Sequence, residues 1–499
     1  MNADEKCWMQ GRRAGVLLHP TSLPHPAGQG DLGPEAFRFV DWLAAAGFSV
    51  WQMLPVGPVH HDRSPYLPRS CFAGHTGLIS ADILREEGLL DAIEAQVPND
   101  DLPDRRRLLQ RAWTAFQRDA DGQAHADFHR FREANNVWLP DYALFRTLGR
   151  HHGDRAWFHW PPSARAADPA TLSELRAEHV AEIEQECFGQ YLFYRQWAGL
   201  HTHARNRGIA LFGDLPIYVA HDSADVWRQR KHFRLDASGQ PLEVAGVPPD
   251  AFSASGQRWG NPLYDWDRLA ASGYGWWIDR IAQQCALFDM LRVDHFRGFE
   301  SYWAIPGDSP TAEQGCWRPG PGSDLFERVA DALGPLPLVA EDLGDITPQV
   351  DALRRRHGFP GMRVLQFAFE GDEDNPHRSR NHTPDTVVYT GTHDNDTTLG
   401  WWQALTQGQR DRILATVGQP AEPMPRALVL EAMASVGRLA VIPMQDLLGL
   451  GREARMNTPG KAEGNWRWQL PETALDAAPD AWIRPMIEDA GRINVAGED

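Results

Sequence analysis

Short apolar runs that end in polar residues recur along the chain, with amphipathic stretches between them. Runs of this kind are typical of parallel strands that are buried on both faces of a sheet. Eight runs have this character: residues 14–18, 49–54, 209–212, 290–293, 338–340, 363–367, 386–389 and 439–444. Helical periodicity marks residues 34–46, 276–288, 348–357 and 425–436. Eight strands joined by helical crossovers predict a closed (β/α)8 TIM barrel, with an open doubly wound sheet as the alternative.

Two intervals depart from the simple strand and helix alternation. Residues 60–205 lie between the second and third predicted strands, are far too long for one crossover and read as charge-rich helices. We expect them to form a helical subdomain inserted into the barrel. Residues 241–262 are rich in Pro, Gly, Ser and Ala without periodicity, which predicts a long active-site loop. Only about 55 residues follow the last strand, so we expect one catalytic unit over residues 1–499 with no C-terminal β domain.

Composition narrows the possible partners. Lys and Arg number 49 against 67 Asp and Glu, and the net charge of −18 repels phosphate backbones and anionic lipid surfaces, so neither nucleic acid nor a membrane is expected as a partner. No apolar run has the length of a signal peptide or a membrane span, which predicts a cytoplasmic protein. The 20 Trp residues suit a cleft that holds flat sugar faces, although buried packing accounts for most aromatic residues in most proteins.

Metal and cofactor signals are weak. Five scattered cysteines without a CxxC pair favour free thiols, and the paired histidines at 60–61, 151–152 and 201/203 point in diverging directions on a helix. We therefore interpret the histidines as solvated faces and expect neither a metal nor a cofactor. The segment GQGDLG at 28–33 matches a dinucleotide-binding glycine pattern, but it begins about ten residues after its strand and lacks the acidic ribose ligand.

Polar side chains gather where the predicted strands end. In a barrel these ends converge on one mouth, where catalytic groups sit. The residues in such positions are Asp214, Arg292, Asp294, Glu341, His393, Asp394 and Asp446.

Three of these residues suggest glycoside chemistry. Arg292 and Asp294 are two apart on one strand, so they share a side and the guanidinium can keep the carboxylate ionised, as attack on an anomeric carbon requires. Glu341 follows an apolar strand, where desolvation raises the pKa of a carboxyl until it serves as an acid. A retaining mechanism needs such a pair about 5 to 5.5 Å apart. Each feature also has a purely structural alternative. Arg292 and Asp294 could form a buried ion pair without a catalytic role, and Glu341 could be a carboxylate satisfied by local hydrogen bonds.

At these residues the sequence resembles the 4-α-glucanotransferases, the amylomaltase or disproportionating-enzyme family. The matching stretches, in the family's order, are FGDLPIYV (212–219), QRWGNPLYDW (257–266), LRVDHFRGF (291–299), AEDLG (340–344), TGTHDNDT (390–397) and MNTPGKAEGNWRW (456–468). The resemblance implies a (β/α)8 barrel and the transfer of α-1,4-glucan segments from a maltooligosaccharide or amylose donor to the 4-hydroxyl of another glucan or of glucose.

The resemblance also implies roles for individual residues. Asp294 would be the nucleophile of a retaining double displacement, Glu341 the acid and then the base, and Asp394 the transition-state stabiliser. Arg292 and His393 would assist them. Residues around the glucan groove would be Tyr66, Asp250, Phe252, Trp259 and Asn465, with Asp214 also on the substrate side.

One segment departs from the family pattern. The family reads SPYxxxSxFAGNP, whereas this chain reads SPYLPRSCFAGHTG, so His75-Thr76 replaces Asn-Pro and puts local sugar contacts in doubt. A different class of protein, a non-catalytic glucan binder on the same barrel, is also conceivable. Degenerate relatives usually lose a nucleophile or an acid, and Asp294, Glu341 and Asp394 are all present, which favours an enzyme.

Overall fold

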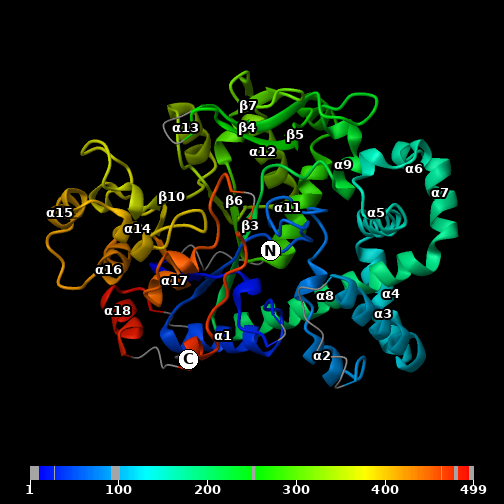
Figure 1. Ribbon diagram of the computed structural model, residues 1–499, viewed down its shortest axis with the longest axis horizontal. Helices are drawn as coiled ribbons and strands as arrows, with labels where there is room; N and C mark the ends of the chain where they lie inside the picture. The colour runs from blue at the N-terminus through cyan, green and yellow to red at the C-terminus, as the bar shows by residue number, and fades with distance from the viewer. Residues whose placement is uncertain are drawn as a thin grey trace.

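The computed structural model describes residues 11–26, 28–91, 102–249, 253–461, 463–476 and 481–493. Its centre is a closed barrel of eight parallel strands in the order β1-β12-β11-β10-β9-β6-β3-β2 (Figure 1). The strands are β1 (Arg13–Leu17), β2 (Val50–Gln52), β3 (Ala210–Leu215), β6 (Met290–Val293), β9 (Leu338–Ala340), β10 (Gly361–Val364), β11 (Thr386–Tyr389) and β12 (Leu439–Pro443).

The barrel confirms the predicted fold. Each of the eight apolar runs contains or overlaps one strand, and the pairing of β1 with β12 closes the sheet and excludes the open doubly wound alternative. The run at 363–367 is displaced, because β10 ends at Val364 and residues Leu365–Phe367 form a 3-10 helix. Apolar character marks burial in both elements, so it does not fix the boundary between them.

Successive side chains along each barrel strand point alternately into the barrel interior and toward the surrounding helices. In β12, Leu439 and Val441 belong to the interior cluster, whereas Ala440 and Ile442 pack toward the helices. Phe212, Met290 and Val339 also face inward. Positions two residues beyond these three therefore point into the mouth of the barrel.

Helices follow most strands. The predicted helices are confirmed with their ends shifted by at most two residues, as α1 (Pro34–Ala46), α11 (Gly275–Leu287), α13 (Pro348–Arg356) and α16 (Arg426–Ala434). The other helices outside the long interval are α9 (Ala224–Arg228), α10 (Trp266–Ala271), α12 (Gly322–Leu333), α14 (Thr398–Ala404), α15 (Gln407–Thr416), α17 (Met444–Leu447) and α18 (Ile483–Asp489). No helix in the described ranges combines the length and the apolar character needed to cross a membrane.

Helices also fill the interval between β2 and β3, on one side of the barrel (Figure 1). They are α2 (Ala81–Glu86), α3 (Leu102–Asp119), α4 (Gly122–Ala134), α5 (Leu139–His151), α6 (Pro162–Ala166), α7 (Pro169–Glu178) and α8 (Val180–Asn206). The long helix α8 packs against α3, α4 and α5 and also against α1 and β3. One helix is thus shared by the inserted helices and the barrel wall.

A second sheet was not predicted. It is antiparallel, in the order β5-β4-β7-β8, and consists of β4 (Glu243–Val247), β5 (Gln257–Pro262), β7 (Ser301–Pro306) and β8 (Cys316–Pro319). The expected loop at 241–262 is therefore wrong over half of its length, because β4 and β5 pair with each other. Gly246 permits this pairing, since a Cβ there would lie 2.1 Å from the Gln257 carbonyl oxygen.

The described residues after Pro443 contain helices and irregular segments but no strand. One contact joins this part of the chain to the barrel. The fully buried guanidinium of Arg492 donates to backbone carbonyls of Arg13, Met433, Ser435, Gly437 and Arg438. These carbonyls surround the beginnings of β1 and β12, where the barrel closes.

Candidate active site

The mouth of the barrel brings together side chains from β3, β6 and β9. Asp214 is two residues beyond Phe212, Arg292 two beyond Met290, and Glu341 two beyond Val339, so each continues an inward-facing row. Asp294 continues the row of Arg292. Strands β3, β6 and β9 are neighbours in the barrel, which places these side chains next to one another.

Arg292 is the centre of this group. Its Nη1 donates to both carboxylate oxygens of Asp214, at 2.8 and 2.6 Å, and its Nη2 lies 2.8 Å from Asp294 Oδ1 and 3.9 Å from Glu341 Oε2. The predicted contact between Arg292 and Asp294 is confirmed. Burial acts to lower the pKa of Arg292, but the carboxylates of Asp214 and Asp294 outweigh it, so the pKa is well above its usual value.

Asp214 is enclosed by protein groups. Its side chain is 1% exposed, and Oδ2 also accepts a hydrogen bond of 2.8 Å from the Tyr66 hydroxyl. Burial raises the pKa of this carboxyl, whereas Arg292 and Tyr66 favour its ionised form. Asp214 therefore orients Arg292, and its oxygens are engaged within the protein.

Glu341 lies in a different environment. Oε2 accepts from the His295 backbone N–H at 2.7 Å and Oε1 from the Leu343 N–H at 2.8 Å. Burial raises the pKa of Glu341 to about 7; the charge of Asp294 adds to this shift, and Arg292 opposes it. Burial thus favours the protonated form of Glu341, which is the form that a general acid requires.

The backbone of His295, which donates to Glu341, has an unusual conformation. His295 has φ of 47°, in the left-handed region that residues other than glycine rarely occupy. Its N–H reaches Glu341, and its ring makes an edge contact with Trp259, with centroids 4.9 Å apart. The sequence motif contains His295, but side-chain chemistry alone gave no reason to select a backbone donor. Trp259, a predicted groove residue, is brought to the site through this contact.

Asp394 enters from the loop after β11. Its side chain is 48% exposed, and Oδ1 accepts from Asn457 Nδ2 at 2.6 Å and lies 3.3 Å from His393 Nε2. Burial lowers the pKa of His393, which favours its neutral imidazole. Asn457 was missed as a functional residue, although it lies within the MNTPGKAEGNWRW motif.

The ends of the Asp394 loop are fixed by Asp446. The Asp446 carboxylate accepts from the Thr390 hydroxyl at 2.5 Å and from the Thr398 hydroxyl and N–H at 2.6 and 2.7 Å. Thr390 precedes Asp394 and Thr398 follows it, so one buried carboxylate on α17 holds both ends of the loop.

Tyr66 connects this loop to the carboxylates on β3 and β6. While its hydroxyl donates to Asp214, its ring stacks on His393 with centroids 5.1 Å apart and an interplanar angle of 16°. Trp466 completes an aromatic group with both rings, at 6.0 Å from Tyr66 and 5.9 Å from His393. Trp466 was not selected from the sequence.

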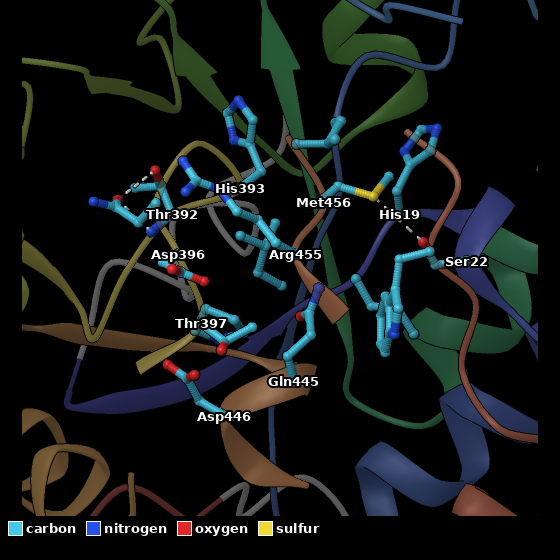
Figure 2. Close-up of a pocket in the computed structure, with 16 residues that line it drawn as sticks. His19, Ser22, Thr392, His393, Asp396, Thr397, Gln445, Asp446, Arg455 and Met456 are labelled. Carbon is cyan, nitrogen blue, oxygen red and sulfur yellow. Dashed lines mark hydrogen bonds between the residues drawn. The ribbon is translucent and has the colours of Figure 1, made fainter. Parts of the chain in front are cut away.

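An open pocket adjoins this aromatic group through His393 (Figure 2). Leu17, Leu54, Met456 and Trp468 line its apolar side. Asp294, Glu341 and Asp394 are not among its lining residues. They remain reachable, since their side chains are 27%, 11% and 48% exposed.

The remaining predicted groove residues have no described contact with the carboxylates at the barrel mouth. The Asn465 side chain accepts from the Thr458 N–H at 2.9 Å and donates to the Lys461 carbonyl at 2.9 Å, so it shapes its own turn. Asp250 and Phe252 lie outside the described residues. The unusual His75 begins a 3-10 helix, where its Nδ1 accepts from the Gly77 N–H at 3.3 Å.

Comparisons with known proteins agree with this geometry. The model of a family described as 4-alpha-glucanotransferase matches residues 18–474. The chain is 45% identical over 496 residues to a 4-alpha-glucanotransferase of Thermus thermophilus, covering 97% of this chain and 99% of the relative. It is 43% identical to a chloroplastic/amyloplastic 4-alpha-glucanotransferase of Solanum tuberosum, covering 97% and 87%. The structure of an amylomaltase from Streptococcus agalactiae in complex with acarbose is similar, with a TM-score of 0.93, 36% identity and coverage of 97% and 100%.

Proposed function

The chain belongs to the 4-alpha-glucanotransferase family and has that activity, and we propose that Asp294, Glu341 and Asp394 carry out the reaction. Asp294 acts as the nucleophile, Glu341 as the acid and then the base, and Asp394 as the group that stabilises the transition state. The observation that carries these assignments is the position of Arg292 Nη2 between Asp294 and Glu341, at 2.8 and 3.9 Å. Two carboxylates that share one nitrogen are close enough for the separation of about 5 to 5.5 Å that retention needs.

In the first step, Glu341 donates its proton to the glycosidic oxygen while an oxygen of Asp294 attacks the anomeric carbon. The bond from that carbon to the leaving chain breaks, the leaving chain keeps the proton as its 4-hydroxyl, and a covalent glucosyl-enzyme forms. The contact from Arg292 favours the ionised form of Asp294. The Glu341 carboxyl can supply the proton because burial raises its pKa to about 7, which favours the protonated form.

In the second step, Glu341 is a carboxylate and acts as a base. It removes the proton from the 4-hydroxyl of an acceptor glucan, whose oxygen attacks the anomeric carbon and displaces Asp294. The product has a new α-1,4 bond, and both carboxyls return to their starting states. Water at the same position would give hydrolysis instead.

Asp394 and His393 form hydrogen bonds with sugar hydroxyls as the glucose ring flattens in the transition state. Asn457 and the neighbouring imidazole hold the Asp394 carboxylate, and 48% of its side chain remains exposed and available to a substrate. Asp250 and Phe252, between β4 and β5, and Trp259 on β5 would position the acceptor and displace water. Tyr66 and Asn465 would border the same groove, with Asp214 behind Arg292.

The substrates we propose are maltooligosaccharides and amylose as donors, with another glucan or glucose as acceptor. Acarbose is bound in the similar Streptococcus agalactiae amylomaltase. We also propose a cytoplasmic location, which the free cysteines among the described residues support, since a reducing compartment keeps thiols unpaired.

Incubation with maltotriose alone tests the reaction type. Transfer gives glucose together with maltooligosaccharides longer than the substrate, and the number of reducing ends stays constant because each broken bond is replaced. Chromatography of the products with a parallel reducing-end assay measures both. A rise in reducing ends without longer products would show a hydrolase, and no change at all would contradict catalysis on this substrate.

A further inference from the structure

A group of metal-binding side chains lies among the inserted helices. His151 is the last residue of α5, His179 lies between α7 and α8, and Glu182 is in the first turn of α8 (Figure 1). One ligand atom from each residue lies within 4.8 Å of the others. None of these residues belongs to the barrel strands or to the catalytic group.

The geometry of this group is compact. His151 Nε2 is 2.9 and 3.0 Å from the two oxygens of Glu182, and His179 Nδ1 is 3.7 Å from Glu182 Oε1. The two imidazole rings lie 4.4 Å apart at 37°. His151 and Glu182 are 44% and 42% exposed, so an ion can reach the group from solvent, while His179 at 12% is held within the fold.

We propose that His151, His179 and Glu182 bind a Zn²⁺ ion. Two imidazole nitrogens and one carboxylate oxygen form a ligand set that Zn²⁺ accepts, with water in the fourth position. Ligands in such a site lie about 2.0 to 2.2 Å from the ion, which is compatible with the spacing of these atoms after small rotations of the exposed His151 and Glu182 side chains. Mg²⁺ and Ca²⁺ prefer oxygen ligands and are poor candidates.

The charges around the group favour a cation. Glu178 lies 4.0 Å from His179 Nε2 and adds a second carboxylate. Arg150 is the opposing charge, with Nη2 3.9 Å from Glu182 Oε2. However, its Nη1 pairs with Glu186 and its Nη2 donates to Thr147 Oγ1 at 3.2 Å, so the guanidinium has other partners besides Glu182.

His152, the sequence neighbour of His151, is not part of this group. The His152 ring lies beside Trp160, with centroids 5.5 Å apart, as expected from the divergence of adjacent helical residues. The neighbours of His151 are instead His179 and Glu182, which lie at the junction of α7 and α8. A bound ion would therefore link the end of α5 to that junction and stabilise the inserted helices.

Zinc titration of the full chain tests this proposal. After dialysis against a chelator and then metal-free buffer, calorimetry with ZnCl₂ should show roughly one tight site per chain and thermal melting should show a higher Tm with Zn²⁺. His179→Ala and His151→Asn should each weaken the affinity by more than about tenfold and abolish most of the Tm shift. Mg²⁺ should produce neither effect.

His129→Asn is the matched control. His129 lies 3.3 Å from Glu133 on α4, as an exposed pair that no third ligand joins within the described part of the chain, so this variant should bind Zn²⁺ like the original chain. His151→Asn changes an exposed side chain, and its melting profile without metal shows whether the fold is kept. Failure of the original chain to bind Zn²⁺, or equal affinity in all variants, would overturn the proposal. Neither result would bear on the transfer reaction.

Discussion

Asp214 and Arg292 face each other in register across strands β3 and β6 and form a two-oxygen ion pair that is almost fully buried. The pair leaves the second nitrogen of the guanidinium free to contact Asp294 and Glu341. The guanidinium that contacts the two proposed catalytic carboxylates is therefore itself held by a residue of the neighbouring strand.

Replacement of this guanidinium by an ammonium group should impair catalysis. Arg292→Lys keeps a positive charge but cannot contact Asp214 and Asp294 through two fixed nitrogens. We expect kcat for maltotriose transfer to fall by about 100-fold or more. Arg318→Lys, at an arginine that bonds Glu243 in the second sheet, is the control and should change kcat less than about twofold. Equal effects of both substitutions would contradict the assigned role of Arg292.

Removal of the nucleophile or the acid should stop turnover. Asp294→Asn and Glu341→Gln keep the side-chain shapes but lose nucleophilicity and proton transfer, so we expect kcat to fall at least about 1000-fold. Binding of maltoheptaose, measured by calorimetry, should remain. Asp345→Asn tests a nearby carboxylate with an 88% exposed side chain and should leave kcat unchanged. Substantial turnover in both active-site variants would refute the assignments.

The pH dependence of the reaction should report Glu341. Only the protonated form can donate to the leaving oxygen, and burial raises its pKa to about 7, so kcat/KM should fall as pH rises through neutrality. Initial rates of maltotriose transfer between about pH 5 and 9 measure this decline. Circular dichroism at each pH separates it from unfolding. A rate that stays constant to the alkaline end of this range would show that another group is the acid.

We expect Asp446 to act as a positioning residue for Asp394, because it bonds both ends of the Asp394 loop. Asp446→Asn replaces one accepting oxygen by an amide donor, which opposes the donors of Thr390 and Thr398. We expect kcat to fall by about tenfold or more because the Asp394 loop loses its fixed ends. Thr390→Val combined with Thr398→Val should reproduce the effect, since these changes remove the two hydroxyl donors that bond the Asp446 carboxylate. Unchanged kcat in both proteins would argue against this role.

Arg492 should matter for stability and not for chemistry. Arg492→Ala removes donors from five backbone carbonyls at the base of the barrel, and we expect a loss of about 3 kcal/mol in the free energy of unfolding. Denaturant titration measures this loss, and kcat of the folded protein should be retained. Arg484→Ala, at a partly exposed arginine that bonds Ala45 and Glu488, should cost much less.

The barrel was predictable because each strand is buried on both faces and therefore forms a continuous apolar run. The same reasoning failed for β4 and β5, which are interrupted by glycine and proline. Their burial depends on β7, which begins more than fifty residues after β4. No local pattern in residues 241–262 reveals a partner at that distance.

The candidate site shows a similar division. The positions of Asp294 and Glu341 at neighbouring strand ends follow from alternation and strand order, and the contact of Arg292 with Asp294 follows from their spacing. The pairing of Arg292 with Asp214 depends on the register between two strands, and the N–H of His295 reaches Glu341 only through a left-handed backbone. Tyr66 meets His393 across more than three hundred residues. Such contacts exist only after the chain has folded.

The shared helix α8 has a mechanical consequence. Its 27 residues run without interruption from the packing against α3, α4 and α5 to the packing against α1 and β3. Rotation of the inserted helices as a unit would have to bend α8 or tear it from the barrel, and both disrupt hydrogen bonds or buried packing. We therefore expect the inserted helices to keep their position relative to the barrel, so that any adjustment to a bound substrate takes place in the segments between the strands at the mouth.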